Sequence, residues 1–545
     1  MKMINRIVKI SLALSVLGMF SCKNLTELNV NPNGTTPETV NPTFLMTEVL
    51  TETAKDYLRL GYGEQGIFAG VMQQTQLDAF SDATNDYSWS DQNWDGYYGL
   101  LNDNKKAYER AEAESNDFIM GVSLVMKSFL FGLITDLWGD VPYSAALNGD
   151  KGGTGDLMPV YDAQKDIYTG IINDLKTAEG LLAKGNSVTA DWDAYYNGDA
   201  AKWQKFAGSL LLRYYMRISS KLPDVAKAGI EDVVSSGSYF KSNDDDATMS
   251  FLGTNADNSW PDNLEFDITN GSNFRRIKMC ATFVNALESY SDPRLGVWAA
   301  KVQIPIVITN TASTNPDTVI NGVRYIHPAA IPPGTLVDTD PNYVGIPPSI
   351  GSEPSWYNLN PTPGQKSENP HVSYLNDIYK NASGPLLKAR LMSFAEVDFI
   401  LAEAALKGWS VGADAETYYD AAVKASLDTW GVGGDYGNYI KGAEVAYNGT
   451  LEQIMTQKWI ASWSAAEEAW FDYRRTGYPD LQAGPNAKRK KLPVRYVYSS
   501  EELNLNTVNV NNALKDLKAT NFSGPEGVNS AWSKMWLLQD TGEPW

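Results

Sequence analysis

The sequence of residues 118–138 is FIMGVSLVMKSFLFGLITDLW, an almost unbroken apolar run. The run is long enough to cross a membrane as a helix. However, Lys127 lies near its centre and Asp136 near its end, and a charged side chain costs about 2.5–3.5 kcal/mol at the centre of a bilayer. The residues just before it, Ser-Asn-Asp at 115–117, are typical caps of a helix N-terminus. We therefore predict a helix that is buried inside the protein rather than a transmembrane span.

Helical periodicity extends outward from this run in both directions. Apolar residues recur at the spacing of one helix face, and short loops separate neighbouring segments, which is typical of stacked helical hairpins. A strict repeat of about 34 residues is not visible, so residues 43–236 are predicted to form a degenerate helical array. The segments expected to be helical are Thr43–Tyr57, Asp95–Ala113, Phe118–Trp138, Ala163–Leu182, Ala200–Ser220, Asp224–Ser235, Leu391–Gly408, Ala415–Trp430 and Leu451–Tyr473.

Residues 237–385 have a different character. Clusters of Pro, Gly, Asn and Asp dominate them, with short β-favouring runs such as residues 302–308, and paired prolines exclude regular structure locally. We expect an irregular ligand-binding insert with small hairpins and some helix. Residues 386–545 are expected to return as helices and a tail that pack on the array. The predicted fold class is mostly α with a large irregular loop and short-strand region, where recognition usually resides.

The N-terminus has the features of an export signal. Basic residues, and no acid, precede an apolar stretch over residues 10–20 that is too short to span a bilayer. The stretch leads to Cys22 in a context that resembles a bacterial lipobox, although Phe20 is bulkier than the usual residue. We expect a signal peptide over residues 1–21, lipidation of Cys22 and a polar tether over residues 22–42. An ordinary signal peptide followed by a chance cysteine is the alternative.

The overall composition limits the possible partners. The chain has 65 Asp+Glu against 45 Lys+Arg, a formal net charge of −20, so most of its surface would repel a polyphosphate and we expect no nucleic-acid partner. A hydrophobic fraction of 43% with 11% aromatic residues is typical of a globular protein. Besides Cys22 the chain contains one cysteine, Cys280, in the apolar segment 277–283. It is expected to be a buried small hydrophobe.

Five motifs occur in order along the chain. They are NVNPN at 29–33, DLWGDVPY at 136–143, EVDFILAEA at 396–404, QKWIA at 457–461 and EAWFDYRRTGYP at 468–479. Together they resemble the SusD/RagB family of outer-membrane lipoproteins of Bacteroidetes, and the resemblance covers essentially the whole chain after the expected signal peptide.

The resemblance implies a tetratricopeptide-like helical scaffold that carries an irregular ligand-binding region. It also implies a lipid-anchored protein of the outer membrane, exposed at the cell surface, which captures a glycan and delivers it to a SusC-like TonB-dependent transporter. Some members of the family bind peptides instead. The motif residues Trp138, Trp470 and Arg474-Arg475 are expected to serve packing and pairing with acids such as Asp472. Ligand residues differ too much within the family to be transferred by motif.

Candidate ligand residues are therefore aromatic rings on loops beside polar side chains. Trp and Tyr faces attract the C–H faces of sugars, and nearby amides and acids bond the hydroxyl groups. Loops at 86–94, 255–263 and 355–358 fit this pattern, with Trp89 preferred over Trp94 in the first loop. Core packing or a transporter contact is the alternative for each ring. The expected ligand-binding residues are Tyr87, Trp89, Asn93, Trp94, Trp260, Asn263, Trp356 and Tyr357, with Arg275 added for an anionic ligand.

No catalytic motif is apparent in the chain. Its two histidines, His327 and His371, lie in Pro-rich segments without metal-ligand spacing, and neither a P-loop nor a G-x-S-x-G motif is present. We expect no cofactor, no metal and no enzymatic activity. A surface glycoside hydrolase remains an alternative, because a catalytic carboxylate pair is formed in space rather than in sequence. A purely structural lid is the third hypothesis.

Overall fold

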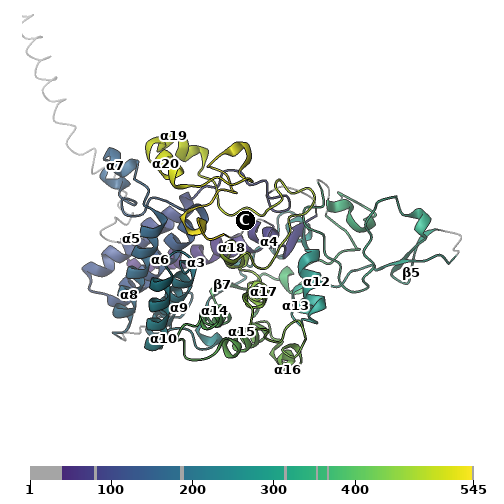
Figure 1. The fold of residues 1–545 in the computed structure, drawn as a ribbon, viewed down its shortest axis with the longest axis horizontal. Helices are drawn as coiled ribbons and strands as arrows, with labels where there is room; N and C mark the ends of the chain where they lie inside the picture. Colours follow the sequence, from purple (N-terminus) through teal and green to yellow (C-terminus); the bar gives the residue numbers. More distant parts are fainter. Residues whose placement is uncertain are drawn as a thin grey trace, which may run out of the picture.

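The computed structural model describes residues 40–64, 66–78, 83–184, 190–311, 316–351, 354–364 and 367–542. Most of the helices lie together in one large body, and an arm that carries β5 projects from it on the opposite side from α8 (Figure 1). The expected signal peptide, Cys22 and nearly all of the expected tether lie outside the described residues.

The N-terminal half forms a layered array of helices. Helix α6 packs against both α5 and α8, while α9 packs against α8 and α10 and α3 packs against α5 (Figure 1). This arrangement confirms the predicted stacked hairpins, and short helices fill the connections. The helices are α3 (Pro42–Gly61), α4 (Ile67–Val71), α5 (Asp95–Ala113), α6 (Asp117–Trp138), α7 (Thr154–Leu157), α8 (Gln164–Leu182), α9 (Ala200–Arg217) and α10 (Pro223–Ser236).

Helix α6 is the apolar run 118–138. The side chain of Asn116 caps it by accepting a hydrogen bond from the backbone N–H of Ile119 at 3.1 Å, and the helix ends at Gly139, whose φ of 97° suits glycine. Its most apolar window has a mean hydropathy of 1.9, enough for a membrane span, yet 89% of that window is buried inside the protein. The Lys127 ammonium lies 2.9 Å from Asp174 at the surface. The prediction of a buried helix is confirmed.

The C-terminal half supplies further helices, of which α14, α15 and α16 lie below α18 in the view of Figure 1, while α19 and α20 lie above it. Helix α14 packs against α15 and α17, and α18 contacts α3 and α4. The helices are α14 (Phe394–Leu406), α15 (Ala415–Thr429), α16 (Tyr436–Tyr439), α17 (Leu451–Ala461), α18 (Ala466–Thr476), α19 (Ser500–Leu505) and α20 (Thr507–Ala513).

Two predicted helices differ from those observed. The segment Leu451–Tyr473 is not one helix, because Ser464 takes a positive φ of 69° and separates α17 from α18. The helix expected from Leu391 begins only at Phe394. Residues before it form strand β7, and the Ser393 side chain caps α14 by accepting from the Glu396 N–H at 3.1 Å.

The region between residues 237 and 385 combines short helices with three small sheets. Strands β1 (Thr75–Leu77) and β3 (Ile277–Met279) pair antiparallel, as do β2 (Ala247–Ser250) and β7 (Lys388–Met392). In the arm, β6 (Val323–Ile326) lies between β4 (Ile306–Ile308), which is parallel to it, and β5 (Asp317–Ile320), which is antiparallel. The short helices of this region are α11 (Ser272–Arg276), α12 (Ala281–Ser289) and α13 (Leu295–Trp298).

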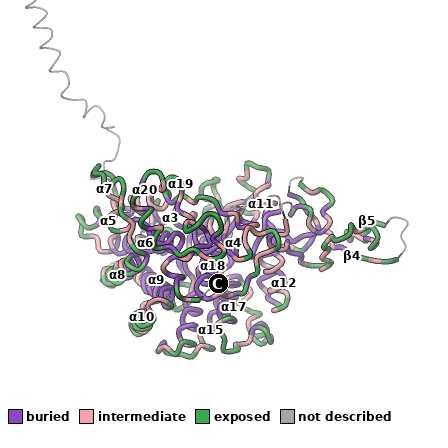
Figure 2. Tube along the Cα trace, turned by 45° about the horizontal axis from the view of Figure 1, so that its top comes forward, coloured by how far each residue is buried: buried purple, intermediate pink, exposed green. Residues whose placement is uncertain are grey.

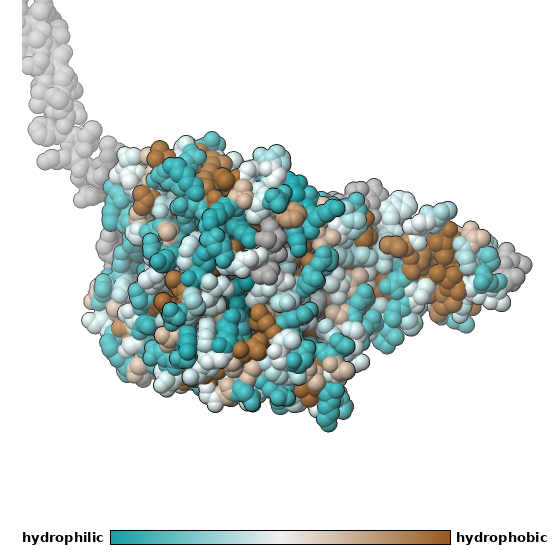
Figure 3. Space-filling view, viewed as in Figure 1, coloured by the Kyte–Doolittle hydropathy of each residue, from teal (hydrophilic) through white to brown (hydrophobic). Residues whose placement is uncertain are grey.

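The arm and the body differ sharply in burial. Buried residues line the inner faces of the body helices, whereas the strands β4 and β5 are mostly exposed (Figure 2). Hydrophobic surface gathers on the arm (Figure 3), where the exposed apolar side chains include Val307, Ile308, Val319 and Ile320.

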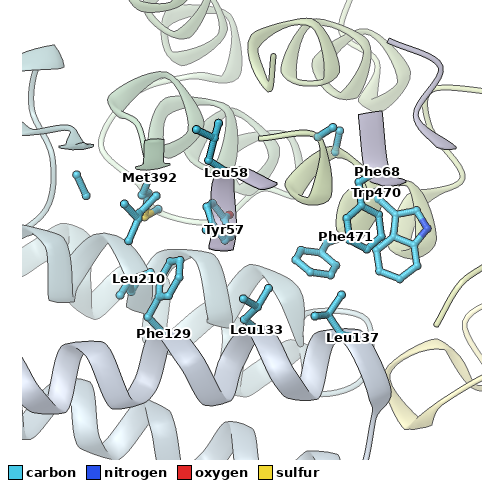
Figure 4. Close-up of a cluster of buried hydrophobic side chains, with 14 of the residues drawn as sticks. Tyr57, Leu58, Phe68, Phe129, Leu133, Leu137, Leu210, Met392, Trp470 and Phe471 are labelled. Carbon is cyan, nitrogen blue, oxygen red and sulfur yellow. The ribbon is translucent and has the colours of Figure 1, made fainter. Parts of the chain in front are cut away.

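The core lies where α3, α6, α9 and α18 meet. Side chains from these helices and from α4 interlock there, including Tyr57, Phe68 and Phe129 (Figure 4). Trp138 and Trp470 are fully buried, as is Cys280. The indole N–H of Trp470 donates to the Pro493 carbonyl at 2.7 Å. These positions confirm the packing roles predicted for the two tryptophans and the cysteine.

Buried ion pairs tie the helices of the body together. Arg213 of α9 contacts Glu396 of α14 at 2.7 Å and Glu468 of α18 at 3.3 Å. Arg217, one turn further on, contacts Glu468 at 2.6 Å and Asp136 of α6 at 3.2 Å. These pairs fix α9 against three other helices, because an unpaired charge at any of these buried positions would be strongly destabilising.

Glu467 of α18 is fully buried against the end of α3, where a Cβ added to Gly61 would lie 2.1 Å from its carboxyl oxygen. Burial, reinforced by the neighbouring charge of Glu468, raises the pKa of Glu467 well above its usual value. The native state therefore keeps a proton that the unfolded chain releases above about pH 4.3. Between the pKa of Glu467 in the unfolded chain and its higher pKa in the folded protein, the free energy of unfolding falls as the pH rises. This group contributes up to about 1.4 kcal/mol per pH unit to that fall.

The substitution Glu467→Gln is expected to remove this contribution. Relative to the wild type, the variant should gain stability at pH 8 and gain much less at pH 4, because at pH 4 both unfolded side chains are largely neutral. Denaturant unfolding of both proteins at the two pH values measures the difference. An equal difference at pH 4 and pH 8 would show that folding does not raise the pKa of Glu467.

Candidate ligand-binding site

A cavity with a volume of 860 Å³ lies in the irregular region beside the arm. Its wall combines apolar groups, neutral polar groups and charges of both signs. The apolar lining is Leu264, Phe274, Ala300, Pro361 and Pro370, with the ring of Tyr374. The polar lining is Arg275, Lys301, Gln303, Thr362, Glu368, Asn376, Asp377 and Lys380.

The segment 370–382 is the central support of this cavity. On one side it pairs with the predicted second loop, since the N–H groups of Trp260 and Leu264 donate to the carbonyls of Ala382 and Lys380, both at 2.8 Å. On the other side the N–H of Ala300 donates to the Tyr374 carbonyl and that of Ile304 to the Pro370 carbonyl, both at 2.9 Å. Backbone bonds therefore hold three separate stretches of chain around one space.

Two rings of the cavity have cationic neighbours. The buried Lys278 ammonium lies 4.0 Å from the centre of the Tyr374 ring and 2.8 Å from Asp78. Burial lowers the pKa of Lys278 to about 8, although Asp78 opposes the shift. On the Phe274 ring, the Lys380 ammonium lies 5.7 Å from the centre. These contacts fix the rings in the wall and place positive charge close behind them.

The polar groups of the wall can bond hydroxyl, amide or carboxylate groups of a ligand. Burial raises the pKa of Tyr374 to about 12, so its phenol stays protonated, and its oxygen accepts from the Asn369 N–H at 2.9 Å. The Lys380 ammonium and the Asp377 carboxylate form an exposed ion pair with an N–O distance of 2.7 Å. Lys301 donates to Asn342 at 2.9 Å, and exposed pairs of this kind are weak enough to exchange for a ligand.

The first predicted loop does not present its rings to a ligand. Tyr87 is fully buried, and Trp89 is 4% exposed and packs against Phe68 and Trp470. Trp94 is 7% exposed and packs against Trp138 with ring centres 5.3 Å apart. A ring without a free face cannot stack on a sugar, so the assignment of these three rings to the ligand is corrected to core packing.

Asn93, the polar member of that loop, is exposed but already bonded within its own turn. Its side-chain oxygen accepts from the Asp95 N–H at 2.5 Å, and its amide donates to the Asp95 carboxylate at 2.8 Å. It therefore closes a turn just before α5, whose N-cap residue is Trp94. Asn93 does not line the cavity.

Trp260 and Asn263, the residues predicted from the second loop, are buried as well. Trp260 is fully buried and packs against Tyr62 with ring centres 4.7 Å apart. The Asn263 amide donates to the Trp260 carbonyl at 2.7 Å and its oxygen accepts from the Phe266 N–H at 3.0 Å. Their role is corrected to shaping the loop from behind, while Arg275, also predicted, does line the cavity.

The third predicted loop contains the exposed ring. Trp356 is 60% exposed, and it is the one exposed tryptophan of the residues that the structure describes. It lies in the 3₁₀ turn Pro354–Leu359, which leads through Asn360 into the cavity-lining Pro361 and Thr362. Tyr357 is half-buried and packs on the small apolar cluster of Val302, Val344, Ile346 and Val372.

Several lining residues were missed in the sequence, notably Phe274, Lys301, Gln303 and Tyr374. The stretch SYLNDIYK at 373–380 does satisfy the criterion of rings beside amides and charges. It contributes Tyr374, Asn376, Asp377 and Lys380 to the wall. No group of three or more potential metal ligands is found among the described residues.

Stacked helical hairpins that support a cavity built from irregular loops define a scaffold-type binding protein. A family model supports this class and makes it specific. The model of the SusD-like family, described as "Starch-binding associating with outer membrane", matches residues 32–314 and 341–499. The chain belongs to this family, so the recognition made from the five motifs is confirmed.

Solved structures share the fold over almost the whole chain. A SusD homologue from Bacteroides fragilis has a TM-score of 0.71 and 23% identity, over 92% of this chain and 100% of that one. A chitin-binding SusD homologue from Flavobacterium johnsoniae has a TM-score of 0.64 and 23% identity, over 90% of this chain and 98% of that one. At such identities these matches establish the fold alone. Among curated proteins, no sequence matches this chain.

Proposed function

We propose that the protein captures a glycan at the cell surface and delivers it to a TonB-dependent transporter of the outer membrane, without cleaving it. The observation that supports this function is the 860 Å³ cavity with the exposed Trp356 in the turn that leads into its wall. A sugar offers C–H faces and hydroxyl groups together. The cavity wall offers amides, a phenol and charges, and the turn that leads into the wall offers one free indole face. Membership of a family described as starch-binding points to the same class of ligand.

The anchoring and the partner are part of this proposal. An acyl group on Cys22 would hold the protein at the membrane, close to the mouth of the transporter, and so raise the effective concentration of bound ligand there. Expression of the full chain and of Cys22→Ala, followed by separation of membrane and soluble fractions, tests the anchor. Recovery of Cys22→Ala in the membrane fraction at the wild-type level would contradict it.

Affinity electrophoresis in gels that contain starch, glycol chitin or polygalacturonate tests the binding itself. We expect retarded migration in at least one gel, and no new reducing ends when the protein is incubated with the same polysaccharide. New reducing ends would instead indicate the glycoside hydrolase. Unretarded migration in all gels would leave the peptide-binding and structural-lid hypotheses, which a peptide-pool binding assay separates.

The charge on the ligand is tested by the same gels. Arg275 and Lys301 both line the cavity, so retardation by polygalacturonate that is lost in Arg275→Gln would indicate an acidic glycan. Retardation by starch or glycol chitin alone, unaffected by Arg275→Gln, would indicate a neutral one.

A further inference from the structure

The arm contains a segment that the family model does not match. The family match stops at residue 314 and resumes at residue 341, and the residues between these positions include strands β5 and β6. They complete the three-stranded sheet that projects from the body (Figure 1). We call it the added segment because it lies outside the family match, and its contacts with the body show what it contributes.

One face of the arm sheet turns toward the body. Ile306 and Ile326 are buried, and Arg324 lies on the same face, opposite Ile306 in the register of β4 and β6. The Arg324 guanidinium forms a two-pronged pair with Asp317 of β5, with N–O distances of 2.9 and 2.8 Å. This pair orients the guanidinium so that its remaining N–H groups point at the body.

Arg324 reaches two stretches of the body at once. Its Nη1 donates to the Leu359 carbonyl at 2.6 Å and to Nε2 of His371 at 2.9 Å. The His371 ring is oriented for this role because its Nδ1–H donates to the Ile304 carbonyl at 2.6 Å. Burial lowers the pKa of His371, with Arg324 adding to the shift, so the imidazole is neutral and Nε2 is free to accept.

A second contact of the added segment reinforces the first. The Asn358 side chain is buried, and its oxygen accepts from the Asp338 N–H at 2.8 Å. Its amide donates to the Asp338 carbonyl at 3.2 Å and to the His371 carbonyl at 2.8 Å. Asn358 holds a left-handed backbone, with φ of 54°, which asparagine tolerates better than most residues.

Both of the stretches that are joined in this way lead directly into the cavity wall. Leu359 is the last residue of the turn that carries Trp356 and is followed closely by Pro361 and Thr362. His371 directly follows Pro370 in the chain, and both Pro370 and the nearby Glu368 line the cavity. The segment added to this chain thus holds two walls of the cavity and the exposed indole in one fixed arrangement.

We propose that Arg324 is a positioning residue for the ligand site, and that the arm sets the specificity of this chain by fixing the turn 354–362 against residues 368–371. The inference rests on the function proposed above for the cavity. It predicts that the arm changes what the site accepts without touching the ligand, because every contact named here is made behind the wall.

Hydrogen–deuterium exchange and binding in parallel test this role with Arg324→Gln. We expect amide exchange in residues 354–371 to become about tenfold faster, because the variant loses the charge-assisted hydrogen bonds that Arg324 donates. The exchange of α6 and α9 should stay unchanged. Affinity for maltoheptaose or chitohexaose, measured by calorimetry, should fall by a similar factor. The exchange measurement needs no ligand, so it tests Arg324 even if neither sugar binds and the proposed function fails.

Two further variants separate positioning from a simple structural role. The swap Asp317→Arg with Arg324→Asp restores the ion pair between β5 and β6 but removes the donor from Leu359 and His371, so it should behave like Arg324→Gln. Ile320→Thr, at an exposed position of the same hairpin, should behave like the wild type. Wild-type exchange in Arg324→Gln, or full recovery in the swapped variant, would overturn the proposal. Weaker binding with unchanged exchange would also overturn it, because Arg324 would then contact the ligand itself.

Discussion

Replacing Arg475 with alanine is expected to lower the free energy of unfolding by about 3–5 kcal/mol, the usual result of removing one partner of a buried ion pair. Its guanidinium forms two bonds of 2.6 Å with the Glu403 carboxylate and one of 3.0 Å with Asp472. Glu403 is 1% exposed. Although burial alone would raise it, Arg475 holds the pKa of Glu403 below its usual value. The truncation therefore removes the nearest partner of a buried, ionised carboxylate and leaves it Lys407 at 3.3 Å.

Denaturant unfolding at neutral pH measures the effect of Arg475→Ala. The matched control is Arg110→Ala, which removes an arginine from an exposed pair with Glu114 at 2.8 Å on α5. Exposed pairs contribute about 0–1 kcal/mol, so this control should unfold almost as the wild type does. Similar losses for the two variants would mean that burial of the Arg475 pair is not the source of its effect.

Replacing Trp356 with alanine is expected to weaken glycan binding about 10- to 100-fold, with little change in stability. Burying an aromatic ring against a ligand contributes about 1.5–3 kcal/mol, and each 1.4 kcal/mol is a factor of about ten in affinity. Since 60% of Trp356 is already exposed in the free protein, its truncation removes little from the core. Calorimetry with the glycan that retards the protein in the gels measures the change in Kd.

Phe44→Ala is the control for the loss of an exposed ring. Phe44 is 70% exposed on helix α3 and does not line the cavity, so its truncation should leave the affinity as it is. Trp260→Ala offers the opposite contrast, because that ring is fully buried and its loss should cost stability of about 3–5 kcal/mol. Wild-type affinity in Trp356→Ala would show that the ligand binds elsewhere.

The helices were largely predictable because their signals are local. Asp95–Ala113 is expected from periodicity and is observed with the same bounds. The predicted helix bounds were wrong where a single backbone angle ends a helix, as at Ser464 between α17 and α18. No residue type at that position requires the helix to end. Local patterns record the face of a helix well, but they do not record a turn that tertiary packing imposes.

The site was less predictable, because exposure of a ring depends on residues far away in the chain. Trp89 looks like a loop aromatic in sequence, yet Trp470 and Tyr496 cover it. Trp356 has a similar sequence context and remains exposed. The cavity itself joins stretches around Arg275, Lys301 and Lys380, and only the backbone bonds of segment 370–382 bring them together.

Helix α6 also bears on how the chain reaches its destination. A secretory channel receives polypeptides in an extended state, and a segment with a mean hydropathy of 1.9 could then leave the channel sideways into lipid and stop there. Lys127, near the middle of the run, makes a membrane span less favourable by about 2.5–3.5 kcal/mol, and Asp136, near its end, adds to that cost. The same two charges pair with Asp174 and Arg217 after folding, so the residues that disfavour a membrane span are satisfied in the finished molecule.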